Sequence, residues 1–376
     1  MNKLSVYVHV PFCRRKCRYC DFVSLDGSYH MAEDYFAMLK KEIDIRKDEM
    51  GKREISTVYF GGGTPSSVDE RYITGILEHI AKNFRLRGDA EITVEANPES
   101  ASYEKLSGFR KAGFNRISMG LQSANDETLE RIGRIHDYKT FEKAFENAEK
   151  AGFDNISVDL MLSLPGESAE NFSHSLDEVI RHDPKHVSVY SLILEEGTPL
   201  FRDYEKGLYE EDDDLDRRMY HLAKRRLKEA GYIQYEISNF ARKGYHSRHN
   251  LYCWDYEEYT GFGLNASSFI NGIRKKNASE INRYMDGIRN SSPCYDEHEL
   301  LSEDEKKKEY LMLALRKTSG IDMNDYLLRF SERFQDEYAR QIKDLTEEGL
   351  CETNDSHFRL TEKGLDFASA AMIMFI

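Results

Sequence analysis

The sequence predicts an α/β fold, in which parallel strands alternate with helices, followed by a smaller and mostly helical module. Two observations predict the sheet: short apolar runs recur through roughly the first 200 residues, and segments with helical periodicity separate them. A third observation, a change to charged helical segments near residue 300, predicts the module. We expect residues 1–235 to form the α/β domain, residues 236–300 an irregular aromatic connection, and residues 301–376 the helical module.

Six runs rich in Val, Ile, Tyr and Phe are predicted to be strands. Several are almost continuously apolar, which is typical of strands buried on both faces of a sheet. The predicted strands are residues 5–10, 57–60, 91–96, 116–120, 156–162 and 187–194. The predicted helices between them cover about residues 32–49, 69–83, 103–112, 138–151 and 169–182.

This alternation indicates parallel βα units with right-handed crossovers. Periodicity leaves two architectures open, a partial (β/α)6 barrel and an open doubly wound sheet. Both place the active site at the carboxyl ends of the strands. In the C-terminal module, two or three predicted helices precede a short predicted hairpin, residues 351–353 and 358–361, which is an order similar to a winged-helix fold.

Composition excludes several classes of protein. The chain has 376 residues, enough for two or three domains, and a formal net charge of −14. Such an acidic balance argues against non-specific nucleic-acid binding and against anionic membrane surfaces. The first ten residues lack the features of a signal peptide, and no run approaches the roughly 18 apolar residues of a membrane span. We therefore expect a cytoplasmic protein without structural disulfides.

Three of the six cysteines lie within eight residues, in the spacing C-x3-C-x2-C. Cys13, Cys17 and Cys20 follow the first predicted strand at its carboxyl end, where this fold places chemistry. Thiolates so close together repel one another, and a bound cation removes the repulsion; four basic residues between them are expected to lower the thiol pKa values further. Short spacings of this kind ligate iron–sulfur clusters. A zinc site completed by His9 or Asp21, or three cysteines without a ligand, are the alternatives.

The residues around the triplet, 7–13 (YVHVPFC) and 19–22 (YCDF), resemble the radical S-adenosylmethionine (SAM) superfamily. More narrowly, they are similar to the branch that contains the oxygen-independent coproporphyrinogen III oxidases and the related heme chaperones. The resemblance runs along nearly the whole chain and implies the partial barrel. It also implies a [4Fe-4S] cluster on the three cysteines, whose remaining iron takes the amino and carboxylate groups of SAM.

Residues at the ends of the later predicted strands match the SAM contacts of this family. The run 61–65 (GGGTP) follows the second strand, and its glycines let the backbone approach a ligand closely. Asp159 lies inside an apolar strand, where a carboxylate needs a partner or a ligand. The resemblance implies that SAM is contacted by Tyr7, Tyr19, Gly62, Gly63, Thr64, Glu95, Gln122, Arg134 and Asp159.

A later motif points to heme. Residues 248–254 (RHNLYCW) match the chaperones' His-Asn-x-x-Tyr-Trp motif, except that Cys253 replaces the tyrosine. A neutral imidazole is a good axial ligand for heme iron, so the resemblance implies that His249 binds heme. The thiol of Cys253 could itself bind iron. The alternative is a histidine that only makes a hydrogen bond in a loop.

Two departures separate this chain from the coproporphyrinogen oxidases. Those enzymes carry a fourth cysteine two residues past the triplet, where this chain has Phe22, and an extension ahead of the first strand. We therefore expect a heme carrier that serves an unidentified hemoprotein, and the resemblance to the chaperones implies a reductant for the cluster and a heme-linked homodimer. A coproporphyrinogen III oxidase, another enzyme acting on a tetrapyrrole, or a radical SAM enzyme with a different substrate are the alternatives, so enzymatic activity stays open.

Overall fold

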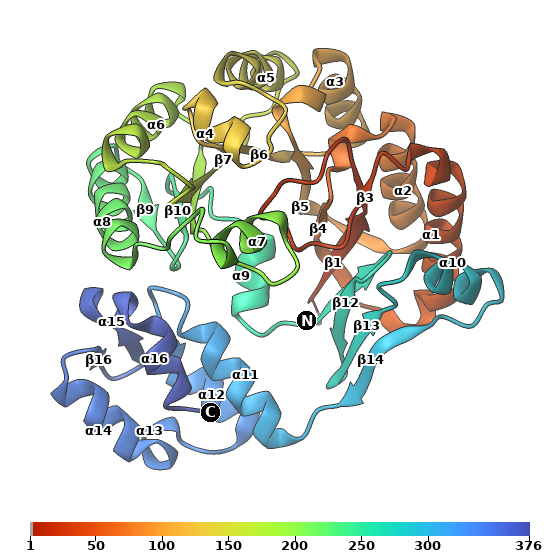
Figure 1. Ribbon diagram of the computed structural model, residues 1–376. Helices are drawn as coiled ribbons and strands as arrows, with labels where there is room; N and C mark the ends of the chain where they lie inside the picture. Colours follow the sequence, from red (N-terminus) through yellow and green to blue (C-terminus); the bar gives the residue numbers. More distant parts are fainter. Residues whose placement is uncertain (1–2) are drawn as a thin grey trace.

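The structure, a computed structural model, describes residues 3–376 and contains a curved sheet of twelve strands with helices outside it (Figure 1). Six neighbouring strands are parallel and lie in the order in which they occur along the chain. These strands are β1 (Lys3–Val10), β4 (Glu54–Gly62), β5 (Arg85–Ala96), β6 (Arg116–Gln122), β7 (Asn155–Leu162) and β8 (His186–Ser191). All six predicted strands are therefore present.

Helices connect these strands over the outer face of the sheet. They are α1 (Ala32–Arg46), α2 (Glu70–Asn83), α3 (Tyr103–Ala112), α4 (Asp126–Arg131), α5 (Tyr138–Lys150) and α6 (Ala169–His182). Their ends follow simple local rules. The side chain of Ser102 accepts a hydrogen bond from the backbone at the start of α3, and Gly113 ends α3 with a φ of 112°.

The strand order decides between the two predicted architectures. A doubly wound sheet reverses its strand order at a switch point, and no reversal occurs from β1 to β8. Because every crossover moves the chain in the same direction, the sheet curls into a partial barrel with its helices outside. The barrel does not close, because the sheet ends at β9 (Ile233–Gln234) on one side and β14 (Tyr295–Leu300) on the other.

Residues 236–300 differ from the predicted irregular connection, because most of them form regular elements. Three strands and β14 extend the sheet beyond β1, and a short strand lies beside β8. These elements are β10 (Asn239–Ala241), α9 (Arg248–Trp254), β11 (Tyr259–Phe262), β12 (Ser267–Ile270), β13 (Ile273–Asn277) and α10 (Ile281–Arg289). The strands β13 and β14 carry many charged residues and few buried ones, so they lack the apolar pattern that reveals a strand.

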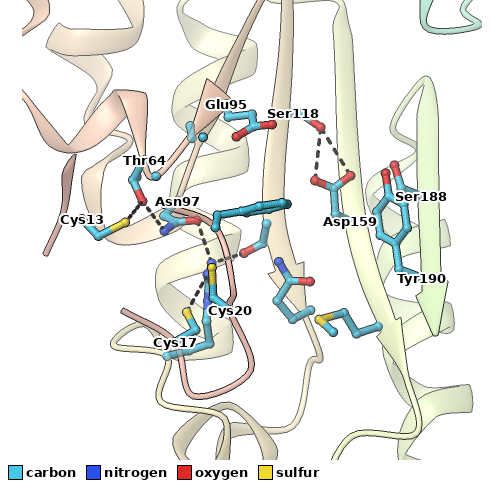
Figure 2. Close-up of a pocket in the computed structure, with 18 of the residues that line it drawn as sticks. Cys13, Cys17, Cys20, Thr64, Glu95, Asn97, Ser118, Asp159, Ser188 and Tyr190 are labelled. Carbon is cyan, nitrogen blue, oxygen red and sulfur yellow. Dashed lines mark hydrogen bonds between the residues drawn. The ribbon is translucent and has the colours of Figure 1, made fainter. Parts of the chain in front are cut away.

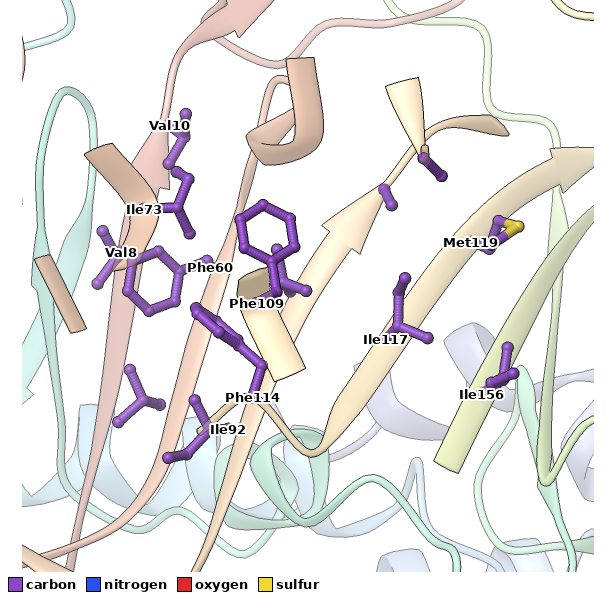
Figure 3. Packing of buried hydrophobic residues seen from close by; sticks show 14 of the residues in the cluster. Val8, Val10, Phe60, Ile73, Ile92, Phe109, Phe114, Ile117, Met119 and Ile156 are labelled. Carbon is purple, nitrogen blue, oxygen red and sulfur yellow. The ribbon is translucent and has the colours of Figure 1, made fainter. Parts of the chain in front are cut away.

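The two faces of each parallel strand have different roles, because successive side chains point to opposite faces. On β1, Val8 and Val10 pack outward in the main core, together with Phe60 of β4 and Ile73 of α2 (Figure 3). His9 lies between Val8 and Val10 in the sequence, so its side chain points to the opposite, inner face of the sheet. The interior faces carry many polar side chains, which explains how Asp159 can sit in an otherwise apolar strand.

The remaining elements complete the chain. Short strands β2 (Phe12–Cys13) and β3 (Leu25–Asp26) flank the cysteine loop, and α7 (Pro199–Glu205) and α8 (Asp213–Glu229) follow β8. The C-terminal residues form helices and a three-stranded antiparallel sheet, as the winged-helix-like prediction requires. These elements are α11 (Glu303–Ala314), β15 (Ile321–Asp322), α12 (Met323–Phe330), α13 (Phe334–Glu337), α14 (Ala339–Glu347), β16 (Cys351–Thr353), β17 (His357–Leu360), α15 (Glu362–Asp366) and α16 (Ala368–Ile373).

The C-terminal module has a hydrophobic core of its own, which Tyr256 and Phe269 of the preceding region join. The module also reaches the other side of the barrel, where Asp366 lies 3.1 Å from His221 of α8, so it packs beneath both α8 and α9 (Figure 1). Within residues 3–376, no helix combines the length and the apolar character that crossing a membrane requires.

Candidate functional site

A cavity of about 420 Å³, here called the first cavity, lies inside the barrel at the carboxyl ends of β4 to β8 (Figure 2). It brings together the predicted cysteines and all the predicted SAM contacts except Tyr7. The predicted residues that line it are Cys13, Cys17, Tyr19, Cys20, Gly62, Gly63, Thr64, Glu95, Gln122, Arg134 and Asp159. They come from the cysteine loop and from successive strand ends, as the βα architecture predicts.

The cysteine loop is fixed to the end of β4 by close backbone contacts. The backbone N–H of Gly63 donates to the carbonyl of Val10 at 2.9 Å, and that of Thr64 donates to the carbonyl of Phe12 at 2.8 Å. A Cβ atom at Gly63 would lie 2.9 Å from both carbonyl oxygens and 3.0 Å from Cys13 Sγ. Only glycine fits here, because the two segments must approach this closely to set Cys13 at the cavity.

The expected lowering of the thiol pKa values is wrong for two of the cysteines. Burial raises the pKa of Cys13, and it raises the pKa of Cys20 to about 11, because desolvation outweighs the nearby basic residues such as Lys16. These thiols are therefore neutral in the absence of a ligand. A bound cationic group would supply the missing stabilisation of their thiolates.

The three thiols can be compared with what the two metal alternatives require. Among residues 3–376, no three His, Cys, Asp or Glu side chains converge as the ligands of a single ion do. In a four-iron cluster each cysteine binds a different iron atom, so the three sulfurs stay apart around it. The three thiols of Cys13, Cys17 and Cys20 thus fit the donor set of a cluster.

A polar network joins the cysteines to the strand ends. Arg134 donates to the Gly120 carbonyl at 2.7 Å, to Asn97 Oδ1 at 2.8 Å and to Cys17 Sγ at 3.5 Å. Asn97 in turn donates to Thr64 Oγ1 at 3.1 Å, and Thr64 Oγ1 lies 3.6 Å from Cys13 Sγ. The network places a guanidinium and two small polar side chains beside two of the thiols, where an anionic or amino group of a ligand can be recognised.

Two carboxylates lie deeper in the first cavity. Tyr59 donates a 2.7 Å hydrogen bond to Glu95, and Ser118 donates to both oxygens of Asp159 at 3.2 and 3.3 Å. Burial raises the pKa of Glu95 to about 7 and raises that of Asp159. Such acceptors suit the hydroxyl groups of a ribose, and their cost of burial is consistent with a binding role.

Tyr7 and His249 lie outside the first cavity and line a second one of about 450 Å³. This second cavity lies between β1, β11, β12 and α9. The Tyr7 hydroxyl is 3.1 Å from His9 Nδ1, and the Tyr7 ring stacks on that of Tyr59, which lines the first cavity. Tyr7 therefore lies beside the wall between the two cavities, and its role as a SAM contact stays a prediction. The β11–β14 extension creates this separate space beside β1. Phe22, which is 62% exposed, lines both cavities.

His249 is held in the barrel by its own helix. Glu91 accepts hydrogen bonds from the backbone N–H groups of Arg248 and His249 at the start of α9. The His249 Nδ1 atom lies 2.9 Å from Thr57 Oγ1, and burial lowers its pKa to about 3. One helical turn later Cys253 lines the same cavity, and burial raises its pKa to about 12.

Sequence reasoning missed several residues of the first cavity. Asn97, Arg116, Ser188 and Tyr190 all line it. Asn97 had a detectable signal, because it directly follows a predicted strand at its carboxyl end. Arg116 had none, because it begins its strand and reaches the cavity only through the length of its side chain.

Comparisons with known proteins agree with this geometry. A family model described as "Radical SAM superfamily" matches residues 7–179, and one described as "HemN C-terminal domain" matches residues 301–367. A protein of Bacillus subtilis named heme chaperone HemW is 36% identical over 96% of both chains. A Bos taurus protein named radical S-adenosyl methionine domain-containing protein 1, mitochondrial, is 32% identical over 100% of this chain and 88% of its own length.

A solved structure gives the same fold. Coproporphyrinogen III oxidase (HemN) from Escherichia coli superposes with a TM-score of 0.87 over 100% of this chain and 90% of that one, at 23% sequence identity. This similarity confirms the radical SAM type of partial barrel and the placement of the helical C-terminal portion. With more than a third of its residues identical to the B. subtilis protein along nearly its whole length, the chain belongs to the HemW family within the radical SAM superfamily.

Proposed function

We propose that this chain is a heme carrier that holds a [4Fe-4S] cluster and SAM in the first cavity and binds heme in the second, for delivery to a hemoprotein. The observation that carries the proposal is the presence of two neighbouring cavities with different chemistry, both in contact with Phe22. One is lined by three thiols and polar strand ends. The other is lined by aromatic side chains and a neutral imidazole. The names of the HemW relatives support the heme assignment.

In the first cavity, Cys13, Cys17 and Cys20 would hold the cluster. A bound cluster would supply the electron that cleaves the sulfonium of SAM, and the chain's own residues bind and orient the nucleotide. Thr64 and Arg134 lie beside the thiols, where they suit the amino and carboxylate groups of SAM. The deeper carboxylates, Glu95 and Asp159, would then accept hydrogen bonds from the ribose hydroxyls.

In the second cavity, His249 has the properties of an axial ligand for heme iron. Its imidazole is neutral at physiological pH because burial lowers its pKa to about 3. Thr57 engages Nδ1, which leaves Nε2 for the iron. Trp254 and Phe269 line the same cavity and can pack against a porphyrin face.

A hemin titration of the anaerobically reconstituted protein tests this proposal. We expect the visible spectrum of bound hemin to change in His249→Ala, and a smaller change in Cys253→Ala. His298→Ala, at an exposed position on β14, is the matched control and should bind as the unmodified protein does. If hemin does not bind, or if His249→Ala leaves the spectrum unchanged, the heme site proposed here is wrong.

A product assay separates the carrier from the enzymatic alternative. Phe22 stands where the related oxidases carry a fourth cysteine, and this departure favours the carrier. Incubation with coproporphyrinogen III, SAM and a reductant should yield no decarboxylated product. If the protein decarboxylates coproporphyrinogen III over multiple turnovers, the carrier proposal is wrong and the protein is an oxidase. The hemoprotein recipient, the electron donor, the heme-linked homodimer and the cytoplasmic location stay predictions from the sequence.

A further inference from the structure

Arg116 is a buried charge without a protein partner. It begins β6, lines the first cavity and is only 2% exposed. Its Nε atom has no hydrogen-bond partner among residues 3–376, and the carboxylates of Glu95 and Asp159 interact with its guanidinium through charge. A buried guanidinium is strongly destabilising unless an acceptor compensates its lost hydration. The side chain therefore calls for an acceptor that the protein itself does not supply.

The two carboxylates that share the cavity do not meet this need. Glu95 accepts the hydrogen bond of Tyr59 at 2.7 Å, and Asp159 accepts those of Ser118 at 3.2 and 3.3 Å. Each carboxylate thus has its own hydroxyl donor. Both influence Arg116 only through longer-range attraction, so its donors remain free for a ligand.

The position of Arg116 differs from that of Arg134. Arg134 lies at the carboxyl end of β6, where it donates to the Gly120 carbonyl and to Cys17 Sγ. Arg116 starts the same strand at its amino end and reaches the cavity from there. The cavity therefore has one guanidinium near the cysteines and a second at its deep end. Figure 2 shows Asp159, Ser188 and Tyr190 on the side of the cavity away from the cysteines.

We propose that Arg116 binds a carboxylate group of a ligand at the deep end of the first cavity. A planar guanidinium matches a carboxylate with two parallel hydrogen bonds, and water-poor surroundings strengthen the contact. A ligand anion must also overcome repulsion from Glu95 and Asp159, which a neutral end of a ligand would not face. The deep end is thus selective among anions, because only an anionic group that forms hydrogen bonds with Arg116 is compensated for this repulsion.

Two ligands of the proposed function carry a carboxylate, and this choice rests on that function. The methionine carboxylate of SAM suits Thr64 and Arg134 beside the thiols, so the source that we expect at Arg116 is a propionate arm of a tetrapyrrole. The SAM carboxylate is the alternative that the test excludes. Two ligand pairs distinguish them. S-adenosylhomocysteine and 5′-methylthioadenosine share a nucleoside, but only the first has a carboxylate. Metal-free coproporphyrin III carries propionates, whereas metal-free etioporphyrin carries none.

The test measures the affinities of these four compounds for the reconstituted protein and for Arg116→Gln, by calorimetry and porphyrin fluorescence. We expect Arg116→Gln to weaken the carboxylate-bearing member of one pair by about tenfold or more, and to leave its partner within about twofold. Arg116→Lys should fall between the two, because it keeps the charge but loses the planar fork. Arg110→Gln, on the exposed face of α3, is the control and should have no effect.

The pair that responds identifies the source of the carboxylate. The proposal is wrong if the unmodified protein binds both members of each pair equally, or if Arg116→Gln weakens neither carboxylate ligand. It is also wrong if Arg116→Gln weakens both members of a pair alike, because that result indicates a general structural loss. Metal-free porphyrins need no axial ligand, so these outcomes are independent of His249. Failure of the heme proposal would appear separately, in the hemin spectrum.

Discussion

The ring of Tyr59 stacks on the imidazole of His249, with ring centroids 5.0 Å apart and planes inclined by 27°. The hydroxyl of the same tyrosine donates to Glu95 at 2.7 Å. Tyr59 therefore touches a residue of each cavity, one with its ring and one with its hydroxyl. Because these two contacts use different atoms, a single substitution can remove one and keep the other.

Tyr59→Phe should alter SAM binding in a pH-dependent way. Glu95 has a pKa of about 7 because burial raises it, and the Tyr59 hydrogen bond opposes that rise. Removing the hydroxyl raises the pKa further, so Glu95 becomes protonated at a higher pH. If the ionised carboxylate binds the ribose and favours the cationic ligand, SAM affinity falls as the pH drops through this pKa.

Calorimetry from pH 6 to pH 8.5 checks this expectation. The midpoint of the affinity change should lie near pH 7 in the unmodified protein and at a higher pH in Tyr59→Phe. Tyr103→Phe, at an exposed position on α3, should keep the unmodified profile. An identical profile in all three proteins would show that Glu95 does not control the binding of SAM.

Replacing any one of Cys13, Cys17 and Cys20 with alanine should remove most of the iron and sulfide. The unmodified protein should hold about four irons per chain after anaerobic reconstitution, and the remaining two thiolates of each variant hold a cluster poorly. Cys294→Ala is the control, since Cys294 lies outside the first cavity. Iron and acid-labile sulfide analysis and visible absorbance give the measurement. A colourless protein that contains zinc would contradict the cluster.

Gly63→Ala should weaken cluster retention without unfolding the chain. Its Cβ would meet the Phe12 and Val10 carbonyl oxygens at 2.9 Å and Cys13 Sγ at 3.0 Å. Backbone atoms cannot rotate away, so the cysteine loop must shift from the end of β4. Iron content should fall and SAM affinity should decrease by about tenfold. Gly88→Ala, where an added Cβ has no neighbour within 4 Å, should match the unmodified protein in both measurements.

The predictable part of the molecule is the part with a strong local pattern. The six parallel strands were evident because their outward faces are buried and apolar, and the cysteine triplet was evident from its spacing. The strands β13 and β14 were not, since residues such as Lys275 and Glu297 give them the composition of a loop. The pairing of β13 with β12 and of β14 with β13 is a tertiary effect that single-sequence periodicity does not contain.

The same limit explains which details of the site the sequence does not reveal. The resemblance places Tyr7 among the SAM contacts, whereas its side chain lines the second cavity, a space beside β11 that the sequence does not reveal. The thiol pKa values depend on burial, which sequence cannot measure. Arg116 could not be recognised, because an arginine at a strand start is ordinarily exposed. The structure singles out Arg116 because its side chain is buried and its Nε atom has no hydrogen-bond partner in the described part of the chain.

The low pKa of His249 makes a prediction about stability. Burial holds this pKa at about 3, whereas an unfolded histidine titrates near 6.5. Below pH 6.5 the unfolded chain therefore takes up a proton that the folded chain refuses. The free energy of unfolding falls by about 1.4 kcal/mol per pH unit from this group, beginning near pH 6.5 and ending near pH 3.

Urea denaturation at pH 7, 6 and 5 can isolate this contribution. Between pH 7 and pH 5, His249 alone should cost the unmodified protein about 2 kcal/mol of unfolding free energy. His249→Gln should lose about 2 kcal/mol less over the same interval. Other buried histidines, such as His9, contribute equally in both proteins and cancel in the comparison. His298→Gln should keep the full pH dependence, because its side chain is exposed. Equal slopes for His249→Gln and the unmodified protein would mean that His249 is not held neutral by burial, and the argument for Nε2 as a ready iron ligand would lose its basis.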